Sequence, residues 1–216
     1  MLVFSEARLV FLAVPKTGST AFETALAPLA AMSVTAPPEL KHAPVFRYNR
    51  FFRPMIERFV APDMDILAVM REPIGWLGSW YRYRQRPAAA GQPTSTHGMS
   101  FDDFVSAYCS GNQPAFARVG SQAKFLEPQR NGTRVTHLFR YEDQPGLIAF
   151  LEARLNTRLE PASLNRSPDR PTPLSAATEA RLRRKFADDF TLWQGIGANG
   201  SYHALAARPA PEPRAG

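Results

Sequence analysis

The chain has 216 residues, of which 44% are hydrophobic, and this length and composition fit one globular domain with its own core. Its formal net charge of +7 favours anionic ligands, but no nucleic-acid-binding motif accompanies the basic residues, so we expect no nucleic acid partner. No apolar run reaches the roughly 18 residues of a transmembrane helix. The N-terminal segment lacks a signal-peptide pattern, and the single cysteine excludes an internal disulfide, so we predict a cytoplasmic protein without a membrane anchor.

The first predicted elements are an apolar strand over residues 8–14 and a helix over residues 20–29. They are joined by the polar loop Pro15-Lys16-Thr17-Gly18-Ser19-Thr20. The unpaired N–H groups and the dipole at the start of a helix suit a phosphate, Lys16 adds a full positive charge, and Gly18 lets the backbone approach the ligand. The usual ATP-binding pattern, G-x-x-x-x-G-K-[ST], places its lysine after the second glycine, whereas Lys16 precedes Gly18. The loop therefore predicts a phosphate site but not a metal-dependent ATPase or GTPase.

A second segment has the same layout. A buried strand is predicted over residues 66–70, and a helix is expected to begin at Pro73, because proline is well tolerated in the first helical turn. Arg71 then lies at the carboxyl end of the strand, the edge at which open α/β sheets bind ligands, and its planar fork of donors matches a phosphate. Ser79 lies on the following helix and offers one hydroxyl. An ordinary ion pair between Arg71 and a carboxylate is the alternative interpretation.

Strands and helices continue to alternate along the chain. The other predicted elements are a short strand over 32–35, a loop over 37–44, a helix with Phe51, Met55, Ile56 and Phe59 at helical spacing, a loop over 87–98, a helix that begins with a capping-box pattern at 100–103, a strand over 135–139, a helix over 146–155, a loop over 161–173 and a helix over 178–192. This alternation predicts an α/β fold in three layers, P-loop-like, with a central, mainly parallel sheet flanked by helices. We expect a single domain over residues 1–205 and a disordered tail over 206–216.

On these motifs the chain resembles sulfotransferases that use 3′-phosphoadenosine-5′-phosphosulfate (PAPS), in particular a bacterial group related to the carbohydrate sulfotransferases. Further similar segments are Lys41-His42-Ala43, Ser121-Gln122, Phe139-Arg140-Tyr141-Glu142-Asp143 and Leu164-Asn165-Arg166-Ser167. The resemblance implies that the loop residues Pro15, Lys16, Thr17, Gly18, Ser19 and Thr20 bind the 5′-phosphosulfate. It implies that Arg71 and Ser79 hold the 3′-phosphate, to which Arg166 and Ser167 add contacts.

Sulfuryl transfer requires stabilisation of a leaving group that gains charge, and Lys16 is the expected stabilising residue. It also requires a general base for the acceptor, a role that suits histidine because its pKa lies near neutrality. In the resembled family the base comes from the region of His42, which is our first candidate. Glu39 is the second, and His97 lies in a loop that could touch the acceptor. We expect no metal.

The expected acceptor is a hydroxyl or amine of a small molecule or glycan, with a carbohydrate or an anionic compound as candidates. No feature of the sequence predicts the oligomeric state. Two other functions fit the sequence: a nucleotide-dependent small-molecule kinase with a degenerate phosphate loop, and a non-catalytic nucleotide-binding module. The kinase would need a carboxylate near the loop to hold Mg²⁺, whereas the binding module would need none.

Overall fold

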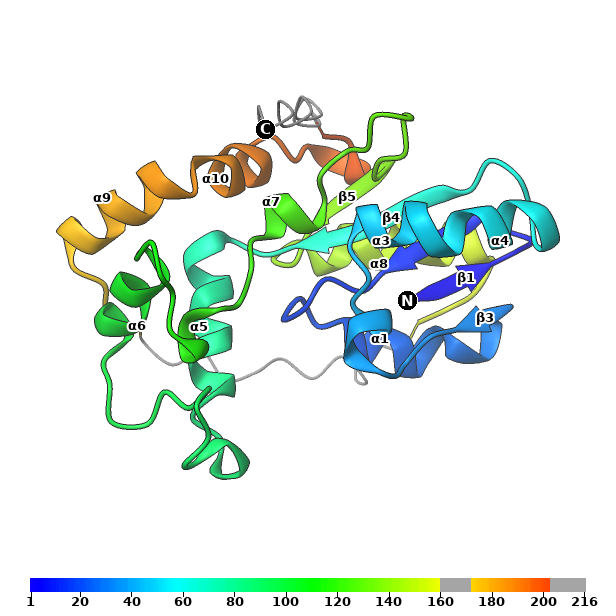
Figure 1. Ribbon diagram of the computed structural model, residues 1–216. Coiled ribbons are helices and arrows are strands. Elements are labelled where there is room, and N and C mark those ends of the chain that lie inside the picture. The colour runs from blue at the N-terminus through cyan, green and yellow to red at the C-terminus, as the bar shows by residue number, and fades with distance from the viewer. Residues whose placement is uncertain (160–171, 203–216) are drawn as a thin grey trace, which may run out of the picture.

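A five-stranded mixed sheet, with strand order β3-β1-β2-β4-β5, lies at the centre of the computed structural model (Figure 1). The structure describes residues 1–159 and 172–202. The strands are β1 (Leu2–Phe4), β2 (Leu9–Leu12), β3 (Met32–Ser33), β4 (Asp65–Met70) and β5 (His137–Arg140).

The three strands β2, β4 and β5 pair in parallel, with Leu9 opposite Asp65 and Leu67 opposite His137. β1 pairs antiparallel with both β2 and β3, so the sheet is parallel only at its centre. The sequence did not predict β1, because Leu2–Phe4 is a short apolar run without alternation. Pairing with β2 through the turn at residues 5–8 gives this run its partner. The α/β class and the flanking helices are confirmed, and the sheet is mixed.

Ten α-helical segments occur within the described residues. They are α1 (Ser19–Leu26), α2 (Pro38–Lys41), α3 (Val45–Arg47), α4 (Arg53–Phe59), α5 (Pro73–Tyr83), α6 (Phe101–Tyr108), α7 (Gln122–Phe125), α8 (Gln144–Leu155), α9 (Ala176–Lys185) and α10 (Ala187–Gln194). The predicted capping box is present, with the Ser100 side chain accepting from the Asp103 N–H and the Asp103 side chain accepting from the Ser100 N–H. The predicted helix over 178–192 is divided at Phe186 into α9 and α10. None of the helices in these parts of the chain is long and apolar enough to cross a bilayer.

The core lies on both faces of the sheet because successive side chains of a strand point to opposite sides. Within β4, Ile66, Ala68 and Met70 contribute to one buried cluster, together with residues of α3, α4, α7 and α10. Leu67 and Val69 contribute to the other, together with residues of α1 and α8. A third cluster, formed by α5, α6, α9 and α10, packs beside the sheet at the left of Figure 1.

Residues 45–59 form one helical run in which a π-helical turn, Tyr48–Phe52, joins α3 to α4. Pro54 has no N–H and its ring crowds the preceding turn, which favours this wider turn. The apolar spacing predicted for this helix does not produce one buried face. Ile56 is buried at 0% exposure, whereas Phe51 and Phe59 are 59% and 78% exposed.

Substitutions on the two sides of this helix are expected to change stability by very different amounts. Ile56→Ala deletes buried methyl groups, so we expect the free energy of unfolding to fall by about 2–5 kcal/mol. Phe59→Ala removes an exposed ring and is expected to change it by less than about 0.5 kcal/mol. Urea unfolding of both variants followed by circular dichroism measures the difference. Equal losses in the two variants would mean that Phe59 packs against the core.

Candidate functional site

One edge of the sheet gathers the predicted site residues. Because β2, β4 and β5 are parallel, their carboxyl ends lie at the same edge, and they lead into the 15–20 loop, Arg71 and Tyr141 respectively. β3 runs in the same direction as β2, so the segment that follows it and contains His42 also starts from this edge. The topology thus brings four separate parts of the sequence together.

The 15–20 loop adopts a strained backbone that leaves the start of α1 open. Lys16 and Gly18 have φ angles of 67° and 74°, in the left-handed region. The buried Thr17 hydroxyl donates to the Val14 carbonyl at 2.9 Å and thereby fixes the base of the loop. The N-cap residue of α1 is Gly18, which has no side chain to cap the helix, whereas the Glu72 carboxylate accepts from the Gly75 N–H at the start of α5. Among the described residues, the Ala21 N–H already donates to the Gly18 carbonyl at 3.1 Å, whereas the Ser19 and Thr20 N–H groups at the start of α1 have no such partner and are available to an anion.

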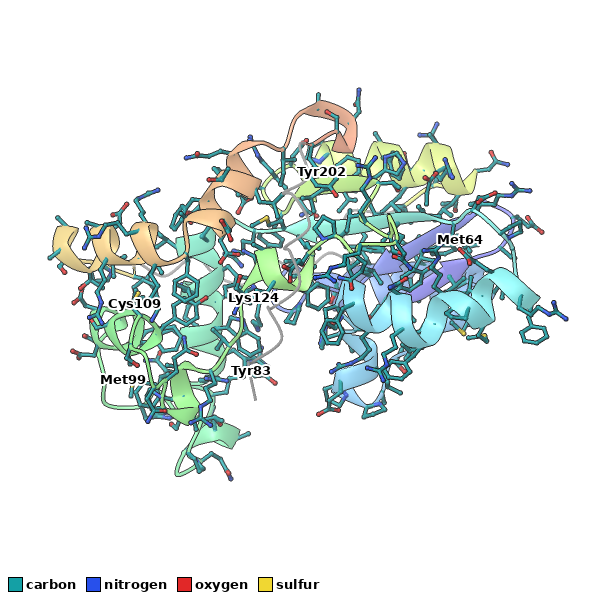
Figure 2. All side chains as sticks on the ribbon, turned by 45° about the horizontal axis from the view of Figure 1, so that its top comes forward. Met64, Tyr83, Met99, Cys109, Lys124 and Tyr202 are labelled. Atoms are coloured by element: carbon teal, nitrogen blue, oxygen red, sulfur yellow. The ribbon has the colours of Figure 1, made fainter. Side chains whose placement is uncertain are left out.

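Lys16 lies among aromatic rings and other cations. Its Nζ is 4.0 Å from the centroid of the Tyr83 ring, at the end of α5 (Figure 2), and 5.8 Å from that of Trp80. Burial is the largest cause, and together with the positive charges of Arg86, Arg71 and Arg82 it lowers the pKa of Lys16 to about 8.

Arg71 is held through its main chain and one aromatic ring. The buried Gln122 side chain accepts from the Arg71 N–H at 2.9 Å and donates to the Arg71 carbonyl at 2.8 Å. The guanidinium carbon lies 4.5 Å from the centroid of the Tyr141 ring. A Cβ on Gly18 would lie 3.2 Å from the same ring, so Tyr141 sits between the loop and Arg71 and keeps position 18 a glycine.

Three cations at this edge, Lys16, Arg71 and Arg86, are not paired with acidic side chains in the part of the chain that the structure describes. The alternative in which Arg71 forms an ordinary ion pair therefore does not hold within the described residues. Aromatic faces take the place of carboxylates: Tyr83 also lies against Arg86, at 4.5 Å. The arrangement is suited to binding an anion with more than one charged group.

The support behind Arg71 extends to Asp189, which the sequence did not single out. The Asp189 carboxylate accepts from the Ser121 hydroxyl at 3.2 Å and from the Ala123 N–H at 2.7 Å, at the start of the helix that carries Gln122. Burial raises the pKa of Asp189 to about 6, against the lowering effect of these hydrogen bonds. Tyr141 was part of a similar segment in the sequence but was given no role. No local sequence pattern could have identified Asp189 or Tyr141, because each contacts a segment that is distant in the chain.

His42 is fixed in one tautomer by the main chain directly after β2. Its Nδ1 lies 2.7 Å from the Ala13 carbonyl, which can only accept, so Nδ1 bears the hydrogen and the neutral ring offers Nε2 as an acceptor. Burial lowers the pKa of His42, although the bond to Ala13 raises it. The neighbouring Lys41 pairs with Glu23 at 2.7 Å and donates to the Thr20 hydroxyl at 3.3 Å, which joins the His42 segment to α1.

The remaining candidates lie elsewhere or are less closely connected. Ser79 is buried on α5, and no hydrogen bond within the described parts of the chain joins it to Arg71. Arg166 and Ser167 lie outside the described residues. Glu39 is exposed in the first turn of α2, and the exposed His97 contacts Ser95 at 2.8 Å. In residues 1–159 and 172–202 no group of three or more His, Cys, Asp or Glu side chains could hold a metal ion.

Comparison with known proteins gives no relative from which to assign this site. No family model matches the chain, and no curated protein matches it. The chemistry of the site is therefore interpreted from its own residues.

The lowered pKa of Lys16 predicts a pH dependence of anion binding. An anion favours the ammonium form, so affinity for adenosine 3′,5′-bisphosphate should be full below pH 8 and fall by up to about tenfold per pH unit above it. Titration calorimetry from acid to alkaline pH measures this slope. In Lys16→Arg, whose charge does not titrate in this range, the slope should disappear. An unchanged slope in that variant would contradict the role of Lys16.

Proposed function

We propose that this protein is a PAPS-dependent sulfotransferase that transfers a sulfuryl group to a hydroxyl or amine of an acceptor, for which a carbohydrate is one candidate. The observation that carries the proposal is the grouping of Lys16 and Arg71, neither of which pairs with a carboxylate of the described residues, around a helix N-terminus whose N-cap residue is Gly18, at one sheet edge. The resemblance of the two motifs to that family supports the same function.

Two separate cationic positions suit a nucleotide with phosphate groups at both ends of its ribose. The 15–20 loop and Lys16 would hold the 5′-phosphosulfate, and the Arg71 fork would hold the 3′-phosphate. Tyr141 packs against both positions and keeps them apart. Gln122 holds the backbone of Arg71, so the guanidinium needs little reorganisation to bind.

PAPS supplies an activated sulfuryl group whose bond to the bridging oxygen breaks as the acceptor oxygen or nitrogen bonds to sulfur. Lys16, in its ammonium form, would stabilise the charge that develops on the bridging oxygen. To do so its Nζ leaves the face of Tyr83, against which it lies in this structure. His42 would take the acceptor proton on Nε2, since Nδ1 is committed to the Ala13 carbonyl.

The kinase alternative is less well supported by the carboxylates near the loop. A Mg²⁺-dependent transferase needs a free carboxylate at the phosphates. Glu23 is paired with Lys41 at 2.7 Å, and the Glu72 carboxylate accepts from the Gly75 N–H at 2.6 Å. A binding module without catalysis gives no reason for the fixed tautomer of His42.

Ligand specificity tests the proposed donor. Adenosine 3′,5′-bisphosphate should raise the melting temperature without metal, with about 2.7 kcal/mol of stabilisation at 100 times its Kd, and Mg²⁺-ATP should do much less. A thermal-shift assay measures both effects. Equal stabilisation by the two nucleotides would exclude the sulfotransferase proposal.

The role of Arg71 is tested by removing its side chain. Arg71→Ala should weaken bisphosphate binding by about 1.5–3 kcal/mol and barely affect the binding of 5′-AMP, which lacks the 3′-phosphate. Calorimetry measures both affinities.

Turnover tests the role of His42. His42→Ala should reduce turnover by roughly 10²–10⁴ and leave bisphosphate affinity nearly unchanged, because the ring faces the acceptor side in this mechanism. The wild-type rate should decrease on the acid side as the ring protonates, with an apparent pKa below the usual 6.5 because burial lowers it. A steady-state assay with radiolabelled PAPS and acceptor pools provides the measurement. Near-normal turnover in the variant would move the base to Glu39 or His97.

A further inference from the structure

Exposed hydrophobic side chains are concentrated in one stretch of the chain. Of the seven large hydrophobic side chains that are exposed in the described residues, five lie within residues 40–59. These five, which we call the apolar patch, are Leu40 (38%), Phe46 (48%), Phe51 (59%), Met55 (37%) and Phe59 (78%). Isolated exposed hydrophobic residues are ordinary, but a concentration of this kind marks an interaction surface.

The π-helical turn places the four patch residues of the 45–59 helix along one side of it, whereas Leu40 lies on α2. Phe46 and Phe51 are five residues apart across the turn, the spacing of the hydrogen bonds in a π-helix. Phe51, Met55 and Phe59 follow at intervals of four, the spacing of neighbours on an α-helical face. The opposite side, with Tyr48 and Ile56, is buried against the sheet. In Figure 2, side chains on the side of α3 and α4 (cyan) that faces away from the sheet project outward.

Arginines are interleaved with the exposed rings. The guanidinium carbon of Arg47 lies 5.6 Å from the centroid of Phe46, and that of Arg50 lies 5.4 Å from the centroid of Phe51. Arg50 and Arg58 are themselves exposed. The acidic residue of this helix, Glu57, already pairs with Arg53 at 2.6 Å. The surface therefore combines apolar side chains with positive charge that no acidic side chain of the helix neutralises.

We propose that the apolar patch and its flanking arginines dock the protein on the surface of an anionic lipid bilayer. A helix with exposed aromatic residues on one face and arginines beside them lies in the interface of a bilayer, where the rings enter the headgroup region and the arginines meet lipid phosphates. Phe59, which is 78% exposed at the end of α4, is the ring best placed to enter the headgroup region of the bilayer.

A second copy of the chain fits this surface less well. Two-fold association through the patch would place Arg50 and Arg58 of each copy near the same arginines of the other, on chains that each have a formal net charge of +7. The proposed docking surface is close in the chain to the candidate site, because α3 begins three residues after His42. The inference stands apart from the proposed function, since it uses neither the 15–20 loop nor Arg71.

Vesicle co-sedimentation of the full chain tests the proposal. We expect binding to vesicles of phosphatidylcholine with about one third phosphatidylglycerol, and much weaker binding to phosphatidylcholine alone. Phe51→Ser combined with Phe59→Ser, which leaves the charge unchanged, should weaken binding by about tenfold or more. Leu29→Ser is the matched control, because Leu29 is 48% exposed outside the patch, and it should bind as the wild type does.

A second pair of variants tests the charge. Arg50→Glu combined with Arg58→Glu should lose most binding to the anionic vesicles, whereas the same change in charge made at Arg184 and Arg130, which are exposed outside the patch, should lose much less. Wild-type melting temperature and bisphosphate affinity in every variant establish that the fold and the nucleotide site are intact, so failure of docking is distinguished from failure of the proposed function.

Three results would overturn the proposal. The first is unchanged vesicle binding in the Phe51 and Phe59 double variant. The second is equal loss in the Leu29 control, which would mean that the binding is not specific to the patch. The third is a light-scattering result in which the wild type is a dimer and the double variant is a monomer, since a second copy of the chain would then occupy the patch.

Discussion

The parallel pairing of β2, β4 and β5 is the constraint on which the rest of the structure depends. Parallel strands share the edge at which they end, so the 15–20 loop, Arg71 and Tyr141 meet although they are distant in the chain. Burial on both faces holds this pairing in register, because helices cover the alternate side chains of β4 on either side. The site is thus a product of the same pairing that forms the core.

Aromatic rings, and no carboxylate of the described residues, lie against the positive charges of Lys16, Arg71 and Arg86 at this edge. Tyr83 lies against Lys16 and Arg86, and Tyr141 lies against Arg71. A ring attracts a cation without neutralising it. The cations therefore still repel one another, and together with burial this repulsion lowers the pKa of Lys16 to about 8. An anion at the site relieves that repulsion, which is the physical basis for the proposed nucleotide site.

The helix over residues 45–59 shows that apolar spacing does not determine burial. Its buried side packs against β2 and β4, and its other side carries the rings that we propose to dock on lipid. The π-helical turn serves both sides, because it keeps Tyr48 and Ile56 toward the core and aligns Phe46 with Phe51 outside. A helix that connects the His42 segment to the core thus also presents a surface to solvent.

The sequence by itself determined the α/β class, the strand, loop and helix around Lys16, the position of Arg71 after β4 and the capping box at Ser100. Each of these depends on residues within one turn or one strand, so local patterns are sufficient. The tertiary structure decided that β1 pairs with β2, that the Lys16 ammonium lies on Tyr83, that Gln122 and Asp189 support Arg71, and that Phe51 and Phe59 are exposed. These features depend on contacts between residues far apart in the chain, and no local pattern specifies which surface a side chain will meet.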